Sequence, residues 1–138
     1  GCLEAYAGRG AMEARARELH DHGHKTDLFH LMEKRERTRL TSGVWAAALD
    51  HGDHMATTLM HRAVAALGAG IASAVNLLDV EAVVIGGGLG TRLGEPYVER
   101  IAEAMQPHLF VDDRPPAMLT AALGDLGGAI GATLLVEP

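Results

Sequence analysis

Three consecutive glycines, Gly86, Gly87 and Gly88, are the residues in this 138-residue sequence whose type and spacing best suit ligand chemistry. They follow a β-branched run at residues 81–85 that predicts a buried strand. Because glycine has no Cβ, a ligand can approach the main chain closely, and free N–H groups can face an anion such as phosphate. On spacing alone a tight structural turn is favoured, and contact with a nucleotide or sugar phosphate is the alternative.

The common phosphate-binding fingerprints do not fit this glycine run. A dinucleotide-binding fold would need a third glycine at the position of Thr91. A P-loop would need a lysine followed by serine or threonine at the end of the loop, and the sequence has none there. The residues therefore argue against both the Rossmann and the Walker type of site.

Eight histidines form a second candidate group for chemistry. His20, His22 and His24 alternate at the end of a predicted helix, and His51 and His54 lie across a turn. Either set could reach a metal ion, but no cysteine accompanies them and the carboxylates nearby are scattered. We therefore interpret them as solvated side chains and predict no metal site from them.

The elements that must position these residues are read from hydrophobic periodicity and from capping and turn residues. In chain order we predict a helix over residues 10–21, a short helix and a polar connection within 24–39, a helix through residue 49 capped by Thr41 or Ser42, a long helix over 56–78, a strand over 81–85, a helix with Pro96 near its first turn and Pro107 at its end, a strand over 117–123, and a small-residue helix over 127–135. Such a strand–helix–strand unit normally forms a right-handed parallel pair.

The long helix over residues 56–78 is predicted to organise the core. Its apolar residues recur at three- and four-residue spacing, which places one face against the rest of the domain. Asp53, at the end of a turn, can cap this helix, and Glu13 and Arg17 are spaced for an i,i+4 ion pair in the first helix.

Composition and charge limit the class of protein. Hydrophobic residues make up 48% of the sequence, which is enough for the core of one domain. The 12 Lys and Arg residues are outnumbered by 18 Asp and Glu, and no predicted helix carries a basic stripe, so we expect no direct nucleic-acid binding. The single cysteine, the absence of a signal peptide and the interrupted apolar stretch at 63–78 predict a cytoplasmic protein with no membrane partner.

Several separated motifs together resemble the ROK family (repressors, open reading frames, kinases). Residues 76–88, which read Asn-Leu-Leu-Asp-Val-Glu-Ala-Val-Val-Ile-Gly-Gly-Gly, resemble its Asn-x-x-Asp-Pro turn, strand and nucleotide loop, with Val80 in place of the proline. Residues 1–4, Gly-Cys-Leu-Glu, resemble the end of the signature Cys-x-Cys-Gly-x-x-Gly-Cys-x-Glu. The His-Gly-Asp turn at 51–53 and the closing Leu-Gly-Asp and Gly-Ala at 123–125 and 131–132 also follow the family pattern.

The resemblance implies a helix-rich α/β fold: part of an actin-like (ribonuclease-H-like) ATPase lobe, with a small parallel strand pair packed by helices. Residues 1–138 would be the C-terminal part of a ROK-type sugar kinase domain, and the start at Gly1 without an initiator Met predicts a fragment of a longer protein. Gly86, Gly87 and Gly88 would lie beside ATP and its Mg²⁺, while the Asp that takes the sugar hydroxyl proton would come from the other lobe.

The start of the chain carries two further residues to which the resemblance assigns roles. Glu4 would accept hydrogen bonds from sugar hydroxyls, although an ordinary carboxylate at a helix start is the simpler interpretation. Cys2 would be one ligand of a structural Zn²⁺ in the intact parent, with a small packing residue as the alternative. Tetrahedral zinc needs four ligands, and the other three would lie upstream of Gly1.

Two functions are compatible with this resemblance. The parent is either an ATP-dependent sugar kinase of hexokinase or glucokinase type, whose partners are a sugar and ATP, or a transcriptional repressor whose equivalent lobe senses a sugar. A structural module with a decayed ligand site is the third possibility. Because a two-stranded sheet leaves edges and an apolar face exposed, we also expect a homo-oligomer, which light scattering after size-exclusion chromatography would test.

Overall fold

The computed structural model describes residues 1–136, apart from the side chain of Asp125. Its helices and strands, in chain order, are α1 (Glu4–Ala7), α2 (Arg9–Asp21), α3 (Leu28–Lys34), α4 (Ser42–Asp50), α5 (His54–Leu78), β1 (Ala82–Ile85), α6 (Gly87–Leu93), α7 (Glu95–Met105), the 3₁₀ turn η1 (Gln106–His108), β2 (Ala117–Thr120), the 3₁₀ turn η2 (Gly124–Leu126) and α8 (Gly127–Thr133). The fold is therefore the helix-rich α/β fold with a two-stranded parallel sheet that the sequence predicted.

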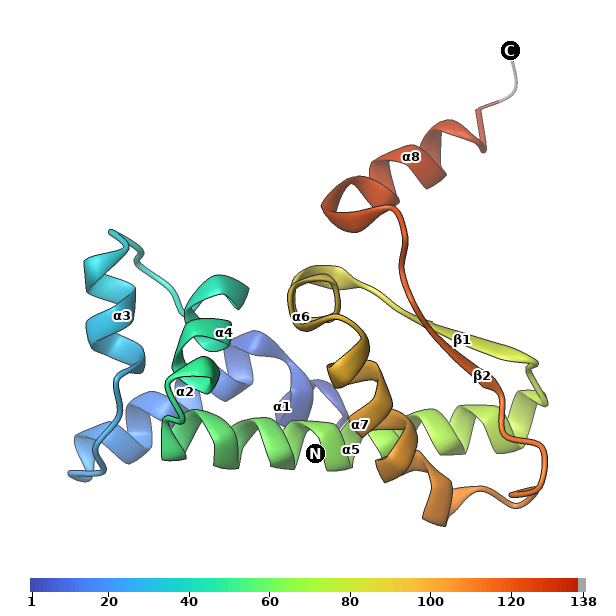
Figure 1. The fold of residues 1–138 in the computed structure, drawn as a ribbon, viewed down its shortest axis with the longest axis horizontal. Helices are drawn as coiled ribbons and strands as arrows, with labels where there is room; N and C mark the ends of the chain where they lie inside the picture. Colours follow the sequence, from blue (N-terminus) through green and yellow to red (C-terminus); the bar gives the residue numbers. More distant parts are fainter. Residues whose placement is uncertain (137–138) are drawn as a thin grey trace.

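Helix α5 runs along the long axis of the molecule, and α1, α2, α4 and α7 contact it (Figure 1). Asp53 caps its first turn by accepting a hydrogen bond from the Ala56 N–H at 2.7 Å, as predicted. The buried face of α5 joins one core with residues from α2, α3, α4 and α7. The largest fully buried side chains in this core are Trp45, Leu28, Leu40, Met60, Ile101, Met105 and Val44.

Helices α5 and α7 approach each other closely at Gly68 and Ala104. A Cβ added to Gly68 would lie 2.5 Å from the carbonyl carbon of Ala104 and 2.7 Å from its Cβ. Only glycine fits this spacing, so the crossing of the two helices depends on the absence of a side chain at residue 68.

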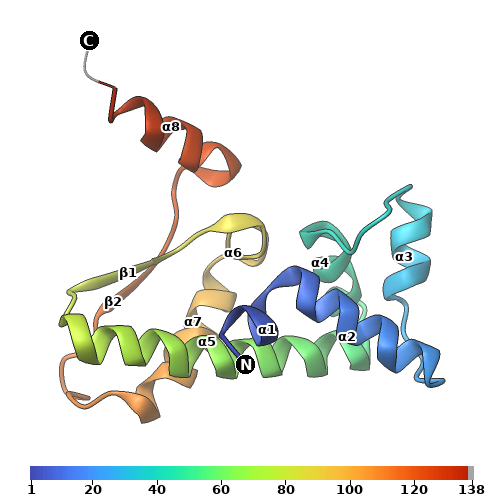
Figure 2. The same ribbon diagram turned by 180° about the vertical axis from the view of Figure 1, so that it is seen from behind.

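Strands β1 and β2 pair in parallel, with Ala82 opposite Ala117 and Ile85 opposite Thr120. The chain passes from β1 through α6 and α7 before it returns as β2, and the glycine run at residues 86–88 starts at the carboxyl end of β1. The sheet keeps much of its apolar surface outside the core, since Val84 and Leu119 are 60% and 49% exposed. Helix α8 projects away from the body of the molecule (Figures 1 and 2).

The structure corrects the predicted boundaries at four places. The glycines do not form a loop, because Gly87 and Gly88 already belong to helix α6, which precedes the predicted helix with Pro96. Helix α1 was not predicted, and β2 ends at Thr120 rather than at residue 123. Thr41 occupies the N-cap position of α4, but its side chain makes no capping hydrogen bond.

Helix α5 is long and apolar enough, by length and composition, to cross a membrane; it is the one such helix among residues 1–136. The core helix of a globular protein meets the same criteria. Here α5 buries residues such as Met60 and Ala63 against other helices, which identifies it as a core helix of this fold.

Replacement of Gly68 by alanine tests the close crossing of α5 and α7. We expect Gly68→Ala to lower the free energy of unfolding by about 1–3 kcal/mol net, because the added Cβ must displace the backbone of Ala104. Gly10→Ala is the matched control in α2, where the new Cβ would meet only the Arg39 Nη2 atom at 3.7 Å. That control should gain about 0.5–1 kcal/mol from helix propensity. Urea unfolding followed by circular dichroism measures both, and a Gly68→Ala protein as stable as the wild type would contradict the contact.

Candidate functional site

The glycine run forms a tight connection between β1 and α6. Gly86 is extended, with φ −124° and ψ −163°, and Gly87 has φ +77°, a left-handed conformation that glycine adopts without strain. No atom lies within 4 Å of a Cβ built on Gly87, so the requirement for glycine there is conformational rather than spatial. The connection thus turns the chain sharply from the carboxyl end of β1 into α6.

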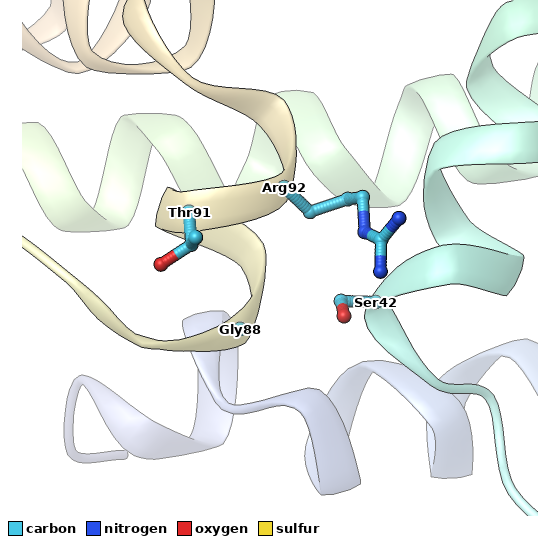
Figure 3. A pocket seen from close by; sticks show the side chains of 4 residues that line it. All are labelled: Ser42, Gly88, Thr91 and Arg92. Atoms are coloured by element: carbon cyan, nitrogen blue, oxygen red, sulfur yellow. The ribbon is translucent and has the colours of Figure 1, made fainter. Parts of the chain in front are cut away.

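A pocket of about 350 Å³ lies beside this connection and is lined by Ser42, Gly88, Thr91 and Arg92. Ser42 begins α4, whereas the other three residues belong to α6, so the pocket lies between two helices that are far apart in sequence. In Figure 3 the Arg92 side chain extends from α6 toward Ser42. The lining offers two hydroxyl groups, a guanidinium and a stretch of main chain without a Cβ.

Arg9, the first residue of α2, brings a second guanidinium to Gly88. A Cβ built on Gly88 would lie 3.4 Å from the Arg9 Nη1 atom and 3.4 Å from the Ser42 Oγ atom. These two polar atoms therefore converge on the main chain at the start of α6. Residue 88 is close enough to them that even a methyl group would touch both.

Glu13 fixes the segments that carry Arg9 and Ser42. Its side chain is only 7% exposed, and its carboxylate accepts hydrogen bonds from the Arg17 guanidinium at 2.7 Å, from Arg39 Nε at 3.1 Å and from the Leu40 N–H at 3.0 Å. Helix α2 is thereby tied to the residues just before α4. The predicted Glu13–Arg17 pair is confirmed, and it is part of a larger cluster.

The charge state of Glu13 follows from these contacts. Burial by itself raises the pKa of this carboxyl. The hydrogen bonds from Arg17, Arg39 and the Leu40 N–H together lower the pKa by more than burial raises it, so the pKa lies below the ordinary glutamate value of 4.5. Glu13 is therefore an ionised, paired carboxylate at neutral pH.

The two candidates near the start of the chain lie apart from the pocket lining. Glu4 is exposed at the start of α1, and its carboxylate lies against Gly8, the residue before Arg9. Cys2 is an exposed free thiol. Within residues 1–136, no group of three or more His, Cys, Asp or Glu side chains could hold a metal ion, so the described residues do not make a complete zinc site.

The structure brings some of the histidines together, although not the alternating set. His24 and His54 line a separate pocket of about 320 Å³ with Leu19, Lys25, Met55 and Thr58. His20 instead packs against Phe29, with the ring centroids 4.9 Å apart and the ring planes tilted by 44°.

Sequence reasoning missed most of the pocket. Ser42 was considered only as a helix cap and Thr91 only as a departure from a glycine motif, and Arg9 and Arg92 were not singled out at all. The one usable signal was that Arg92 lies four residues after Gly88, in the same short helix. No local pattern links Arg9 or Ser42 to residue 88, because only the packing of α2 and α4 brings them there.

Comparison with known proteins assigns this chain to a family. All 138 residues match the model of the ROK family. The chain belongs to the ROK family. The resemblance seen in the sequence is thus confirmed, although a comparison with curated protein sequences gives no significant match.

Solved structures of ROK proteins share the fold. A ROK hexokinase from Thermus thermophilus is 30% identical, with a TM-score of 0.68 over 97% of this chain and 39% of the hexokinase. A ROK glucokinase from Streptomyces griseus, solved in complex with glucose and AMPPNP, is 25% identical, with a TM-score of 0.73 over 99% of this chain and 44% of the glucokinase. A ROK transcriptional regulator, a homologue of the E. coli MLC protein, is 22% identical, with a TM-score of 0.68 over 87% of this chain and 28% of the regulator.

These alignments confirm the predicted fold class: the chain has part of the actin-like ATPase fold of ROK sugar kinases. It spans less than half the length of the solved relatives it matches. The family includes both sugar kinases and a transcriptional regulator, so the match identifies the family without separating these two activities.

Replacement of Glu13 tests the anchor beneath the pocket. A carboxyl whose folded-state pKa is depressed stabilises the fold above the unfolded-state pKa, and this contribution is lost as the pH falls through the folded-state value. We expect Glu13→Gln to lower the free energy of unfolding by about 1–3 kcal/mol at pH 7, with a difference from the wild type that shrinks below pH 4.5. Glu18→Gln, which alters an exposed pair with Arg15 on the same helix, is the control and should change stability little. Urea unfolding at several pH values gives both results, and an effect of Glu13→Gln that is equal at all pH values would exclude this electrostatic role.

Proposed function

We propose that this chain is part of an ATP-dependent sugar kinase of hexokinase or glucokinase type, in which the glycine connection lies beside the nucleotide. The parent enzyme would transfer the γ-phosphate of ATP to a sugar hydroxyl. Residues 1–138 would be the C-terminal part of the kinase domain, and they would be inactive as an isolated chain. A cytoplasmic location fits this activity, because ATP is the phosphoryl donor.

One observation carries this proposal. Gly86, Gly87 and Gly88 follow a parallel strand in a chain whose fold matches a ROK glucokinase solved with glucose and AMPPNP. Ligands of parallel α/β sheets bind beyond the carboxyl ends of the strands, which is where these glycines lie. The absence of side chains there leaves the main chain open to a ligand.

Other residues of the chain would play supporting roles in the transfer. Glu4 would accept hydrogen bonds from sugar hydroxyls, and α1 and the start of α2 connect it to Arg9 beside Gly88. The Asp that takes the hydroxyl proton would come from the other lobe of the parent. Mg²⁺ would enter with ATP, since it is usually held largely by substrate phosphates and water, and would neutralise the charge of the transferring group.

A structural Zn²⁺ in the parent is a separate proposal. Cys2 offers one thiolate at an exposed position, whereas structural zinc needs four ligands. Zinc would therefore require ligands contributed by other parts of the parent, and no step of the transfer depends on it. Homo-oligomerisation also stays a prediction, consistent with the exposed sheet residues Val84 and Leu119.

A sugar-sensing lobe of a transcriptional repressor is the second candidate, favoured by the structural match to a ROK transcriptional regulator. The two candidate functions differ in catalysis: a kinase consumes ATP when a sugar is present, whereas a sugar-sensing lobe only binds the sugar. We expect the longer protein that carries this segment to form ADP from ATP-Mg only when a sugar such as glucose is present, measured by a coupled spectrophotometric assay. Sugar binding without sugar-dependent ADP formation would favour the repressor.

Gly88→Val tests the nucleotide assignment in residues 1–138. Its Cβ would lie 3.4 Å from the Arg9 Nη1 and Ser42 Oγ atoms and 3.6 Å from the Ser42 Cβ, with no backbone atom among these nearest contacts. The fold should therefore persist while the added bulk blocks a ligand on the main chain. We expect titration calorimetry to show ATP-Mg binding at least tenfold weaker than in the wild type. Gly128→Val in α8 is the matched control, because nothing lies within 4 Å of a Cβ there. Equal weakening by both variants, or by neither, would argue against nucleotide contact at Gly88.

A further inference from the structure

Two arginines lie near Gly88: Arg9 from α2 and Arg92 from α6. Each of Arg15, Arg17 and Arg39 forms an ion pair with a glutamate. By contrast, no carboxylate among the side chains that the structure describes forms an ion pair with Arg9 or Arg92. Arg92 lines the pocket, and the Arg9 Nη1 atom lies 3.4 Å from a Cβ built on the lining residue Gly88, in a chain whose net charge is −6.

The two guanidinium groups come from different elements of the fold. Arg9 is drawn toward Gly88 from α2, and Arg92 extends from α6 toward Ser42 (Figure 3). An anion beside Gly88 could form a charge-assisted contact with each of these guanidinium groups.

The other groups at the pocket also suit an anion. Ser42 and Thr91 contribute hydroxyl groups that can donate hydrogen bonds, and Gly88 exposes main chain. No aromatic or large apolar side chain lines the pocket, so its described lining offers no stacking surface for a nucleobase. Guanidinium and hydroxyl donors together match the oxygen atoms of phosphate groups.

From these observations we infer that Arg9 and Arg92 bind the phosphate groups of the nucleotide from two sides of Gly88, with the Ser42 hydroxyl as an additional donor. The inference rests on the proposed function, because it takes ATP to be the ligand of the glycine connection. It adds a specific role for two residues from α2 and α6: they hold the polyphosphate chain, while Gly88 permits its close approach. Glu13 supports this role by holding α2 and the segment before α4 together.

The test uses residues 1–138 with Arg9→Met and Arg92→Met, and titration calorimetry with three probes: ATP-Mg, adenosine and inorganic tripolyphosphate. Methionine keeps the length and apolar stem of the side chain but removes the charge. Arg114→Met is the matched control, because Arg114 is an exposed arginine in the turn before β2, at the opposite end of the parallel sheet from Gly86. Far-ultraviolet circular dichroism verifies that each variant is folded.

We expect each of the two variants to weaken ATP-Mg and tripolyphosphate binding about tenfold, the loss of one charge-assisted contact, and to leave adenosine binding unchanged. Arg92→Lys should recover part of the affinity, because it restores the charge. Unchanged ATP-Mg binding in both methionine variants, or an equal loss for adenosine, would overturn the phosphate role while leaving ATP binding itself intact.

The same experiment separates this inference from the proposed function. If the wild type binds tripolyphosphate through Arg9 and Arg92 but does not bind ATP-Mg, the anion site stands and the nucleotide assignment fails. If the wild type binds neither probe, both the phosphate role of these arginines and the nucleotide site are overturned.

Discussion

The close contact of α5 and α7 at Gly68 sets the positions of the elements that carry the site. Because no side chain separates the helices, the Ala104 backbone lies directly on α5, and the buried Ile101 and Met105 join the core. Helix α7 follows α6 through Gly94, whose φ is +63°, and leads on toward β2. The packing of α7 on α5 therefore helps to hold the glycine connection before α6 in place. A two-stranded sheet alone would be too small to hold that connection.

The opposite side of the pocket depends on electrostatics rather than on apolar packing. Glu13 is a buried carboxylate whose hydrogen bonds to Arg39 and the Leu40 N–H join α2 to the residues before α4. The cost of burying its charge is offset by these bonds, and removal of the carboxylate would leave the Leu40 N–H without its partner. This single group thus holds together the two segments from which Arg9 and Ser42 reach the glycine connection.

These two constraints explain how a chain that covers less than half the length of the solved ROK proteins can present a formed pocket. The chain spans less than half the length of the solved ROK proteins, and its sheet has two strands with exposed Val84 and Leu119. Yet the core of helices encloses buried side chains from α2 to α7, and the pocket lies between helices of that core rather than on the exposed sheet. The local geometry at Gly88 is consequently fixed by contacts inside this segment.

The sequence by itself determined the local features: the apolar period of α5, the Asp53 cap, the strand before the glycines, the parallel pair and the family to which the chain belongs. Most of these depend on neighbouring residues or on a short motif, and the parallel pair follows from the general handedness of strand–helix–strand units, so all of them can be predicted without the fold. Only the tertiary structure decided that Gly87 and Gly88 begin a helix, and that Arg9 and Ser42 meet at residue 88. These residues are separated by tens of positions in the chain, and their proximity results from helix packing and from the hydrogen bonds of Glu13, which no local periodicity encodes.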